Sequence, residues 1–257
     1  QAKGLKGEVV DQLSVCINQV QNNLPDPRQV EIDLINALYS NGQIQEALDA
    51  IAVLVKEYPK EPLLYNLQGV CFRVLGHLDE AIKCFEQALT FNSDYAEVYN
   101  NRGNALRELG QEKAAIESYG KALTIKPDYA EAHNNLGVTL QKIGQLDSAV
   151  ESYKKAITSN PEHTEAHNNL GLILQNLGLL DEAVISYEKA ITSNPEHTEA
   201  HNNLANLFKE LKQLDSAVKS YEKVIAINPD YPEAHYNLGN TLRELGQLET
   251  AIKSYEK

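Results

Sequence analysis

The feature that most constrains the fold is a string of fifteen residues that occurs twice without a change. AITSNPEHTEAHNNL fills positions 156–170 and again positions 190–204, a distance of 34 residues. A catalytic site is normally built once, whereas a fixed period of this size indicates similar units stacked along one axis. We therefore expect an array of units and no single central core.

The period extends over most of the chain when the sequence is written in rows of 34 residues from Arg28. Every row has an alanine at one position and a large side chain four residues later. The alanines are Ala47, Ala81, Ala115, Ala149, Ala183, Ala217 and Ala251, and the large residues are Ile51, Phe85, Tyr119, Tyr153, Tyr187, Tyr221 and Tyr255. A second column contains Gly69, Gly103, Gly137, Gly171 and Gly239, with Ile35 in the first row and Ala205 in the sixth.

Each row divides into two amphipathic helices, as row 130–163 illustrates. One helical stripe contains His133, Leu136, Gly137 and Leu140, and a second contains Leu146, Ala149, Val150, Tyr153, Ala156 and Ile157. Gly144 predicts a left-handed end to the first helix, and Asn160-Pro161 predicts the end of the second. The small residues Gly137 and Ala149 should let the two helices approach closely, and Tyr153 should then fill the joint with the next row.

This pattern resembles the tetratricopeptide repeat, whose signature places an aromatic residue, Leu-Gly, aromatics, Ala and Pro at fixed offsets. The matching residues in the fourth row are His133, Leu136-Gly137, Leu140, Ala149, Tyr153 and Pro161. The resemblance covers roughly nine-tenths of the chain and implies an all-α, right-handed superhelical solenoid of helix-turn-helix repeats. The expected repeats are 28–61, 62–95, 96–129, 130–163, 164–197, 198–231 and a truncated 232–257, preceded by a helix in 1–27 that resembles a degraded repeat.

Departures from the signature mark individual rows. The first position of the signature is tryptophan in the family. In rows one to seven of this chain it is Glu31, Tyr65, Tyr99, His133, His167, His201 and His235. Row one has Leu34-Ile35 in place of Leu-Gly, and we expect it to act as a capping unit. Row six has Lys212 where the other rows have the glycine that ends the first helix. A left-handed lysine costs on the order of 1 kcal/mol, so we expect this row to be locally weaker.

Composition excludes several classes of function. The net charge of −13 makes the chain a poor electrostatic match for nucleic acid, and no apolar run is long enough to insert into a membrane. The cysteines Cys16, Cys71 and Cys84 form no paired framework, which favours a reducing, cytoplasmic compartment. Because the chain starts without methionine and stops within a row, we expect it to be a fragment of a larger protein.

No catalytic or metal site is expected. His163 and His167, like His197 and His201, lie four residues apart, a spacing that can hold zinc on a helix. The string HTEAH lacks the glutamate that directly follows the first histidine of the metalloprotease motif, so we interpret the first-column histidines as packing residues. No nucleophile–base arrangement and no phosphate-binding loop stand out. We therefore predict neither an enzyme nor a cofactor.

The candidate binding residues are asparagines on the face of the first helix opposite its packing stripe. At 100° per residue, row positions 4, 7, 8 and 11 point one way and positions 2, 6, 9 and 13 the other. Position 6 contains Asn101, Asn135, Asn169, Asn203 and Asn237, and position 9 adds Asn104, Asn206 and Asn240. These amides could bind a peptide backbone on a concave face, or each could bond a neighbouring helix. The sequence leaves both alternatives open.

The asparagine column resembles that of the repeat region of O-linked N-acetylglucosamine transferases, which implies contact with extended substrate chains. The chaperone-binding subclass has a lysine at position 5, and this chain has none there. Two hypotheses follow. The chain is a protein–protein interaction scaffold, or it is the substrate-recruiting N-terminal region of a glycosyltransferase or sulfotransferase whose catalytic domain lies beyond Lys257. The partner is a protein or peptide whose identity the sequence does not contain, and the terminal helix faces could also support self-association.

Overall fold

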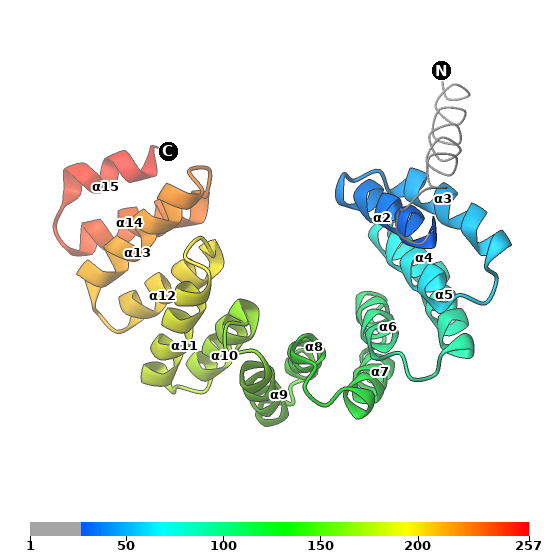
Figure 1. Cartoon of the computed structure of the whole chain (residues 1–257). Coiled ribbons are helices and arrows are strands. Elements are labelled where there is room, and N and C mark those ends of the chain that lie inside the picture. Colours follow the sequence, from blue (N-terminus) through cyan, green and yellow to red (C-terminus); the bar gives the residue numbers. More distant parts are fainter. Residues whose placement is uncertain (1–26, 257) are drawn as a thin grey trace, which may run out of the picture. The chain divides into compact units, whose positions relative to one another are not determined.

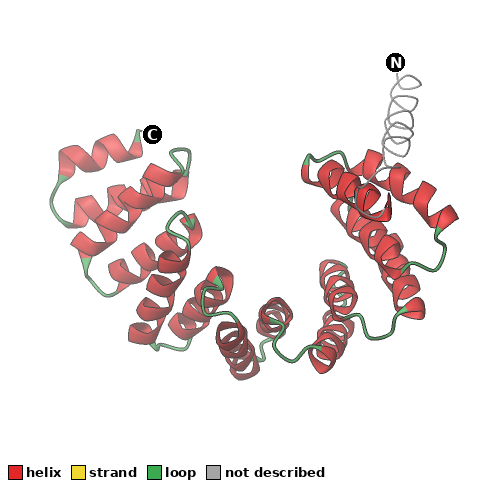
Figure 2. Ribbon diagram, in the orientation of Figure 1, coloured by secondary structure: helices red, strands yellow, loops and turns green. Residues whose placement is uncertain are grey.

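A computed structural model describes residues 27–256, and every element in that range is an α-helix (Figure 2). The predicted all-α fold is therefore confirmed. Residues 1–26, which contain most of the predicted N-terminal helix and Cys16, lie outside the described range. The chain divides into two compact units, residues 1–109 and 110–257, and the boundary falls inside the row 96–129. The right-handed superhelical path expected for the whole array stays a prediction.

The described part of the first unit contains five helices (Figure 1). They are α2 (Pro27–Ser40), α3 (Ile44–Glu57), α4 (Pro62–Val74), α5 (Leu78–Phe91) and α6 (Ala96–Glu108). Helices α4 and α5 form the pair of row 62–95, and α4 also contacts α6. Phe85 is fully buried between them, and a Cβ added to Gly69 would lie 2.5 Å from the Phe85 ring. The glycine is therefore required where the phenyl ring crosses the first helix.

The described part of the second unit contains nine helices, a single helix followed by four pairs (Figure 1). They are α7 (Glu112–Ile125), α8 (Ala130–Lys142), α9 (Leu146–Ser159), α10 (Thr164–Asn176), α11 (Leu180–Ser193), α12 (Thr198–Glu210), α13 (Leu214–Ile227), α14 (Pro232–Glu244) and α15 (Leu248–Tyr255). The two helices of one row pack most extensively, and the first helices α8, α10, α12 and α14 also contact one another in succession. This succession brings equivalent residues of neighbouring rows side by side.

The core of each pair depends on the small-residue columns. Ala149 and Tyr153 are fully buried, and a Cβ on Gly137 would lie 2.6 Å from the Tyr153 ring. The tyrosine thus covers the glycine of its own row, and the same core cluster continues into the next row through residues such as Leu170. Our prediction gave Tyr153 only the second of these roles. The ring serves both because a fully buried side chain contacts neighbours on every side.

The helix ends follow the predicted signals. Gly144 has a φ of +79°. The amide of the next residue, Gln145, donates a hydrogen bond to the Leu140 carbonyl at 2.9 Å. Lys212 adopts the same left-handed conformation with a φ of +60°, and within residues 27–256 it is the one non-glycine residue to do so. The second helix α9 stops at Asn160, whose side-chain oxygen accepts a hydrogen bond from the Glu162 amide at 3.1 Å. Local sequence therefore determines where both helices end.

The first-column histidines are packing residues, as their pattern predicts. The Nε2 atom of His133 lies 2.8 Å from the Pro127 carbonyl, and His167, His201 and His235 make the equivalent contact at 2.9 to 3.0 Å. Tyr65 donates its hydroxyl proton to the Pro59 carbonyl at 2.8 Å from the same position of its row. Histidine thus replaces the aromatic residue and keeps its hydrogen bond, with the proton on Nε2. The bond joins the start of each first helix to the loop before it.

Candidate functional site

The position-6 asparagines lie one per row on the first helices. Asn101 is on α6 in the first unit, and Asn135, Asn169, Asn203 and Asn237 are on α8, α10, α12 and α14 in the second. Asn135 is buried, and the other four are half-buried. They neighbour a second column at position 5, where Asn66, Asn100, Asn134, Asn168 and Asn202 are all buried. Within each unit, two adjacent columns of amides therefore run across successive first helices.

These two columns form an inter-helix ladder. The Nδ2 group of Asn169 donates to the Oδ1 atom of Asn134 in the preceding row at 3.1 Å, and Asn203 donates in the same way to Asn168 at 3.1 Å. In the first unit, Asn101 donates to Asn66 at 3.0 Å. The structure thus supports the alternative in which the amides bond a neighbouring helix, at least for their N–H groups.

The oxygen atoms of the same side chains point to a second role. Within residues 27–256, no hydrogen bond uses the Oδ1 atoms of Asn169, Asn203 or Asn237. Because the donated bond fixes each amide plane, the free oxygen and the second N–H group are held in a set orientation. The ladder therefore holds neighbouring helices together and still presents a repeated polar edge.

The ladder breaks between α12 and α14. Asn237 donates to the Oδ1 atom of Asn206 at 3.3 Å and not to Asn202. The Oδ1 atom of Asn202 is consequently buried without a hydrogen-bond partner in the described part of the chain, although Asn202 is only 5% exposed. The residue at position 9 explains the difference. It is Asn206 in row six, the row of Asn202. In rows two, four and five, where the position-5 asparagine accepts the ladder bond, position 9 is apolar: Val70, Val138 and Leu172.

The position-9 asparagines also support the core tyrosines. Asn206 accepts a hydrogen bond from the Tyr221 hydroxyl at 2.5 Å, and Asn240 accepts one from Tyr255 at 3.0 Å. In rows four and five the acceptor is at position 12, where Gln141 and Gln175 bond Tyr153 and Tyr187 at 2.9 and 3.1 Å. Asn206 and Asn240 were predicted as binding residues, and their oxygen atoms are already used inside the fold. Asn104 is half-buried on α6.

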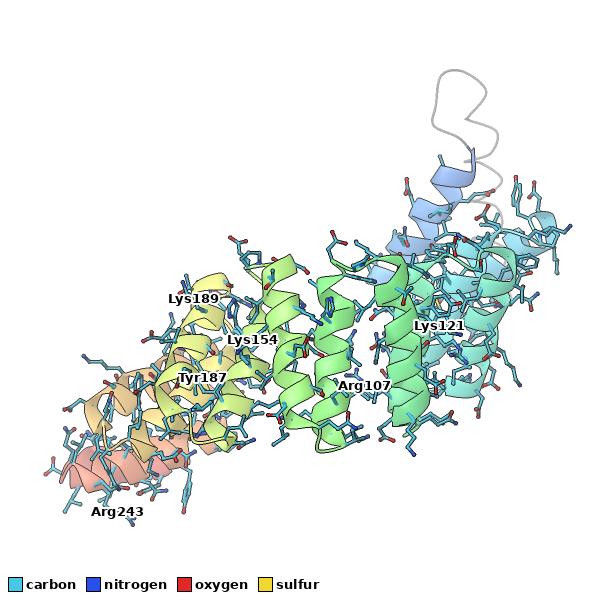
Figure 3. The ribbon with its side chains drawn as sticks, turned by 90° about the horizontal axis from the view of Figure 1, so that it is seen from below. Arg107, Lys121, Lys154, Tyr187, Lys189 and Arg243 are labelled. Atoms are coloured by element: carbon cyan, nitrogen blue, oxygen red, sulfur yellow. The ribbon has the colours of Figure 1, made fainter. Side chains whose placement is uncertain are left out.

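Tyr187 lies among the packed helices of the second unit, and burial raises the pKa of its hydroxyl (Figure 3). Its acceptor Gln175 also donates from Nε2 to Glu210 of the next row at 2.9 Å. In the first unit, Arg73 makes the equivalent contact with Glu108 at 2.6 Å. Positions 12 and 13 therefore form a second link between successive first helices.

Arg107, on α6, is half-buried, and Arg243, on α14, is exposed.

A buried histidine lies between two carboxylates where α8 meets α10. His163 is 7% exposed, with Nε2 3.3 Å from a Glu131 oxygen and Nδ1 3.4 Å from a Glu165 oxygen. Its Nδ1 atom also accepts the Ala166 amide proton at 3.4 Å, which places the proton of the neutral ring on Nε2, toward Glu131. This contact with Glu131 is the main reason that the pKa of His163 is raised. Sequence reasoning missed the cluster, although glutamate at position 2 of rows three to seven signals it.

The nitrogens of His163 and His167 face different partners. His163 is directed at Glu131 and Ala166, whereas His167 faces the Pro161 carbonyl. Across residues 27–256, no three histidine, cysteine, aspartate or glutamate side chains form a group suited to a metal ion. The two described cysteines have no paired partner, and burial raises the pKa of the Cys71 and Cys84 thiols to about 11. Thiols in this state are poor nucleophiles.

Family models decide the relationship of the chain. A TPR-repeat model matches residues 72–110, 103–144 and 205–242, and tetratricopeptide-repeat models match residues 134–198, 186–219 and 232–257. The chain belongs to the tetratricopeptide-repeat family. The matched residues span 72–257, and the exact repeat boundaries, including the first row 28–61, stay a prediction. A comparison with curated proteins finds no match.

Solved structures share this repeat fold. MamA is 27% identical with a TM-score of 0.57, and the match covers 63% of this chain and 94% of MamA. YrrB, described as a TPR protein with an unusual peptide-binding site, is 25% identical with a TM-score of 0.56, covering 73% and 96%. PilF of Pseudomonas aeruginosa is 19% identical with a TM-score of 0.70, covering 76% and 89%, and shows the fold alone. The family match together with MamA and YrrB supports a protein-interaction role for a tetratricopeptide-repeat chain.

Between residues 27 and 256, no helix has both the length and the apolar character needed to cross a membrane. At the end of the second unit, Tyr236, Leu248 and Ile252 are each more than half exposed. These residues form the predicted C-terminal face for self-association, which stays a prediction.

Proposed function

We propose that this chain is a protein-interaction module that binds extended protein segments along the asparagine-lined face of its first helices. The observation that carries the proposal is the fixed orientation of the position-6 amides. Asn169 and Asn203 each use one N–H group in the ladder and leave the side-chain oxygen without a partner in residues 27–256. A peptide backbone offers one donor and one acceptor per residue, which matches such amides without requiring a particular side chain.

Within the second unit, the proposal gives different roles to two parts of the face. Gln141 and Gln175 occupy position 12 of α8 and α10, whereas Arg243 and Glu244 occupy positions 12 and 13 of α14. Charged side chains would add selectivity at α14, and the neutral asparagine amides would hold the backbone at α8 and α10. In the first unit, Arg107 and Glu108 occupy positions 12 and 13 of α6 and would add selectivity there. The peptide-binding site attributed to YrrB supports this kind of ligand. The transferase hypothesis stays a prediction.

The test starts from a random peptide library displayed on phage and selected on the immobilised chain. The best peptides are synthesised and titrated by calorimetry against wild type, single variants and the triple variant Asn135→Ala, Asn169→Ala, Asn203→Ala. One amide hydrogen bond contributes roughly 0.5–1.5 kcal/mol, so each single variant should weaken binding by about two- to tenfold. The triple variant should lose measurable binding.

The matched control replaces three lysines on the second helices. Lys155, Lys189 and Lys223 occupy position 26 of successive repeats and are exposed, and Lys189 is labelled in Figure 3. Their triple replacement by alanine should leave the affinity unchanged. Because the asparagines also join helices, thermal melting accompanies every titration. Unchanged affinity in a folded asparagine triple variant would refute the proposal, as would a wild-type chain that selects no peptide.

A further inference from the structure

Helix α4 of the first unit has an apolar stripe where the other rows have polar residues. Leu63, Leu67, Val70 and Val74 occupy positions 2, 6, 9 and 13 of row two. At 100° per residue these positions lie within about 60° of one another, opposite the packing stripe of the helix. Rows three to seven have glutamate at position 2, asparagine at position 6 and a polar residue at position 13, and row one is polar at all four positions. Row two therefore differs from all others on this face.

The described fold leaves this stripe partly open. Val74 is 49% exposed, and Leu63, Leu67 and Val70 are half-buried. Among residues 27–109, the core clusters include Leu67 and Val70 as partly buried neighbours and do not include Leu63 or Val74. Single exposed apolar residues are common on protein surfaces, whereas apolar residues that gather on one exposed face mark an interaction surface. The two ends of the stripe thus have no packing role in the described part of the first unit.

The neighbouring helix α2 widens the stripe. Positions 5 and 12 of one first helix contact positions 6 and 13 of the next, as the amide ladder and the 2.6 Å contact between Arg73 and Glu108 show. In row one, positions 5 and 12 are Ile32 and Tyr39, both half-buried, in place of the amide and the polar side chain of later rows. Tyr39 and Leu67 pack against the same core cluster, which supports the same register between α2 and α4. The apolar face therefore extends over two helices.

Charged side chains border the two ends of the stripe differently. Asp33 on α2 and Glu97 on α6 are exposed, and Glu61 immediately precedes α4, so the end at which α4 begins is acidic. At the other end, Arg73 and Glu108 form an ion pair. Complementary charges favour one partner and one orientation over others. A partner that covers the stripe is therefore expected to bring positive charge to the start of α4.

We propose that the α2/α4 face binds an amphipathic helix of a partner protein, with lysine or arginine at the end that lies over the start of α4. The stripe runs along one helix for about three turns. An extended segment that crosses successive first helices would contact only one level of α4, whereas a helix laid along α4 covers the stripe from Leu63 to Val74. Apolar residues at i, i+4, i+7 and i+11 of such a helix match the same spacing on α4. This ligand class goes beyond the proposed function, because it requires neither an extended segment nor the asparagines of the second unit.

The experiment selects helical peptides on the immobilised full chain. The peptides are displayed on phage, built on an alanine- and glutamine-rich frame that favours a helix, and randomised on one face and at both ends. Peptides selected on wild type should have apolar residues at i, i+4, i+7 and i+11 and a basic residue at one end. They are synthesised and titrated by fluorescence anisotropy, and circular dichroism should show a gain of helix on binding.

The decisive variant is Leu63→Glu, Val74→Glu. It inserts the residues that rows three, six and seven have at these positions, so the fold accommodates them. It should weaken binding of the selected peptides by about a hundredfold, because two apolar contacts are lost. The matched control is Val53→Glu, Ile185→Glu, which changes two residues that are 52% and 57% exposed on second helices and should leave the affinity unchanged. Melting curves verify that each variant is folded.

A second variant tests the charges. Asp33→Asn, Glu97→Gln should weaken binding by about threefold, as expected for exposed charges. The same variant should bind equally well a peptide whose basic end is replaced by glutamine. A threefold loss that persists with this neutral peptide would overturn the assigned orientation of the partner helix.

The remaining outcomes identify other occupants. The inference is overturned if wild type selects no helical peptide, or if the folded Leu63→Glu, Val74→Glu variant binds like wild type. Light scattering that shows a dimer dissociated by this variant would assign the stripe to a second copy. Peptides that bind only after Leu13→Asp, Ile17→Asp would assign it to the first residues of the chain itself, and both results overturn the inference. The asparagine triple variant should bind the helical peptides like wild type, so failure of the proposed function is measured separately.

Discussion

Repeats five and six begin with the same seven residues, TEAHNNL, and then diverge. Repeat five continues with Gly171, Leu172 and Gln175 and ends its first helix at Gly178. Repeat six has Ala205, Asn206, Lys209 and Lys212 at the same positions. In the identical halves, His167 and His201 both face a proline carbonyl, but Asn168 accepts a hydrogen bond and Asn202 accepts none. The divergent halves form different hydrogen bonds.

This difference shows that one side-chain amide, that of Asn206, can change the hydrogen-bond partners of residues in two neighbouring repeats. Gln175 accepts the proton of Tyr187 from position 12, whereas Lys209 has no acceptor and leaves Tyr221 to Asn206 at position 9. Once Asn206 is present, Asn237 also donates to it, and Asn202 loses the donor that Asn168 keeps. A change inside repeat six thus opens an acceptor at its border with repeat seven.

The largest expected effect should be equal in the two repeats. Ala183 and Ala217 are fully buried where the two helices of each repeat cross. Replacing either by leucine overpacks the crossing and should lower the free energy of unfolding by roughly 1–3 kcal/mol. Denaturant titration of both variants measures this. A variant as stable as wild type would show that the alanine column does not set the helix separation.

The tyrosine bonds should differ between the repeats by partner and not by strength. In double-mutant cycles, Tyr187→Phe should couple with Gln175→Leu, and Tyr221→Phe with Asn206→Leu, each by about 1 kcal/mol. The crossed cycle of Tyr221→Phe with Lys209→Leu serves as the control and should be additive within about 0.5 kcal/mol. Coupling to Lys209 would contradict the exchange of acceptors.

The helix ends give a smaller and reciprocal effect. Lys212 has a φ of +60° where Gly178 has +76°. Lys212→Gly should stabilise the chain by up to about 1 kcal/mol, and Gly178→Lys should destabilise it by a similar amount, because only glycine adopts this conformation without strain. Chemical denaturation of the two variants tests the pair. Opposite signs are required, and a destabilised Lys212→Gly variant would show that the lysine side chain contributes more than its backbone costs.

The smallest effect concerns pH at the α8/α10 junction. The contact with Glu131 raises the pKa of His163 above its unfolded value of about 6.5. Protonated His163 therefore stabilises the fold below that pH, and the contribution is lost as pH rises through the folded pKa. The stability difference between wild type and His163→Gln should shrink across this range. Glu131→Gln should remove the pH dependence, and an unchanged dependence in that variant would assign it to another group.

Most of the fold could be predicted from the sequence because its determinants are local and periodic. The glycine that ends the first helix in every row but the sixth, the Asn-Pro pair that follows the second helix in rows four to six and the alanine column each specify one contact, and repetition makes them unmistakable. The asparagine column was also visible. Its bonding was not, since sequence spacing gives the face of a residue and not the orientation of its amide plane.

The details that the sequence did not reveal depend on contacts between repeats. Nothing local to Asn202 distinguishes it from Asn168, because both lie in the string HNN. Their difference arises four residues later, at Asn206 and Leu172, and acts through Asn237 of the next repeat. The cluster of His163 with Glu131 and Glu165 likewise joins two repeats. Such contacts require the register of neighbouring helices.

The most direct test of the asparagine face is a nuclear magnetic resonance titration that follows the side-chain NH₂ groups of Asn169 and Asn203 as a selected peptide is added. Asparagine-to-alanine variants assign the signals, and the exposed loop residues Asn160 and Asn194 serve as internal controls. If the position-6 amides form hydrogen bonds with a partner backbone, the chemical shifts of their NH₂ groups should change in proportion to saturation. The chemical shifts of the loop asparagines should stay unchanged. Saturable binding that leaves Asn169 and Asn203 unmoved would contradict the account and place the peptide on another surface.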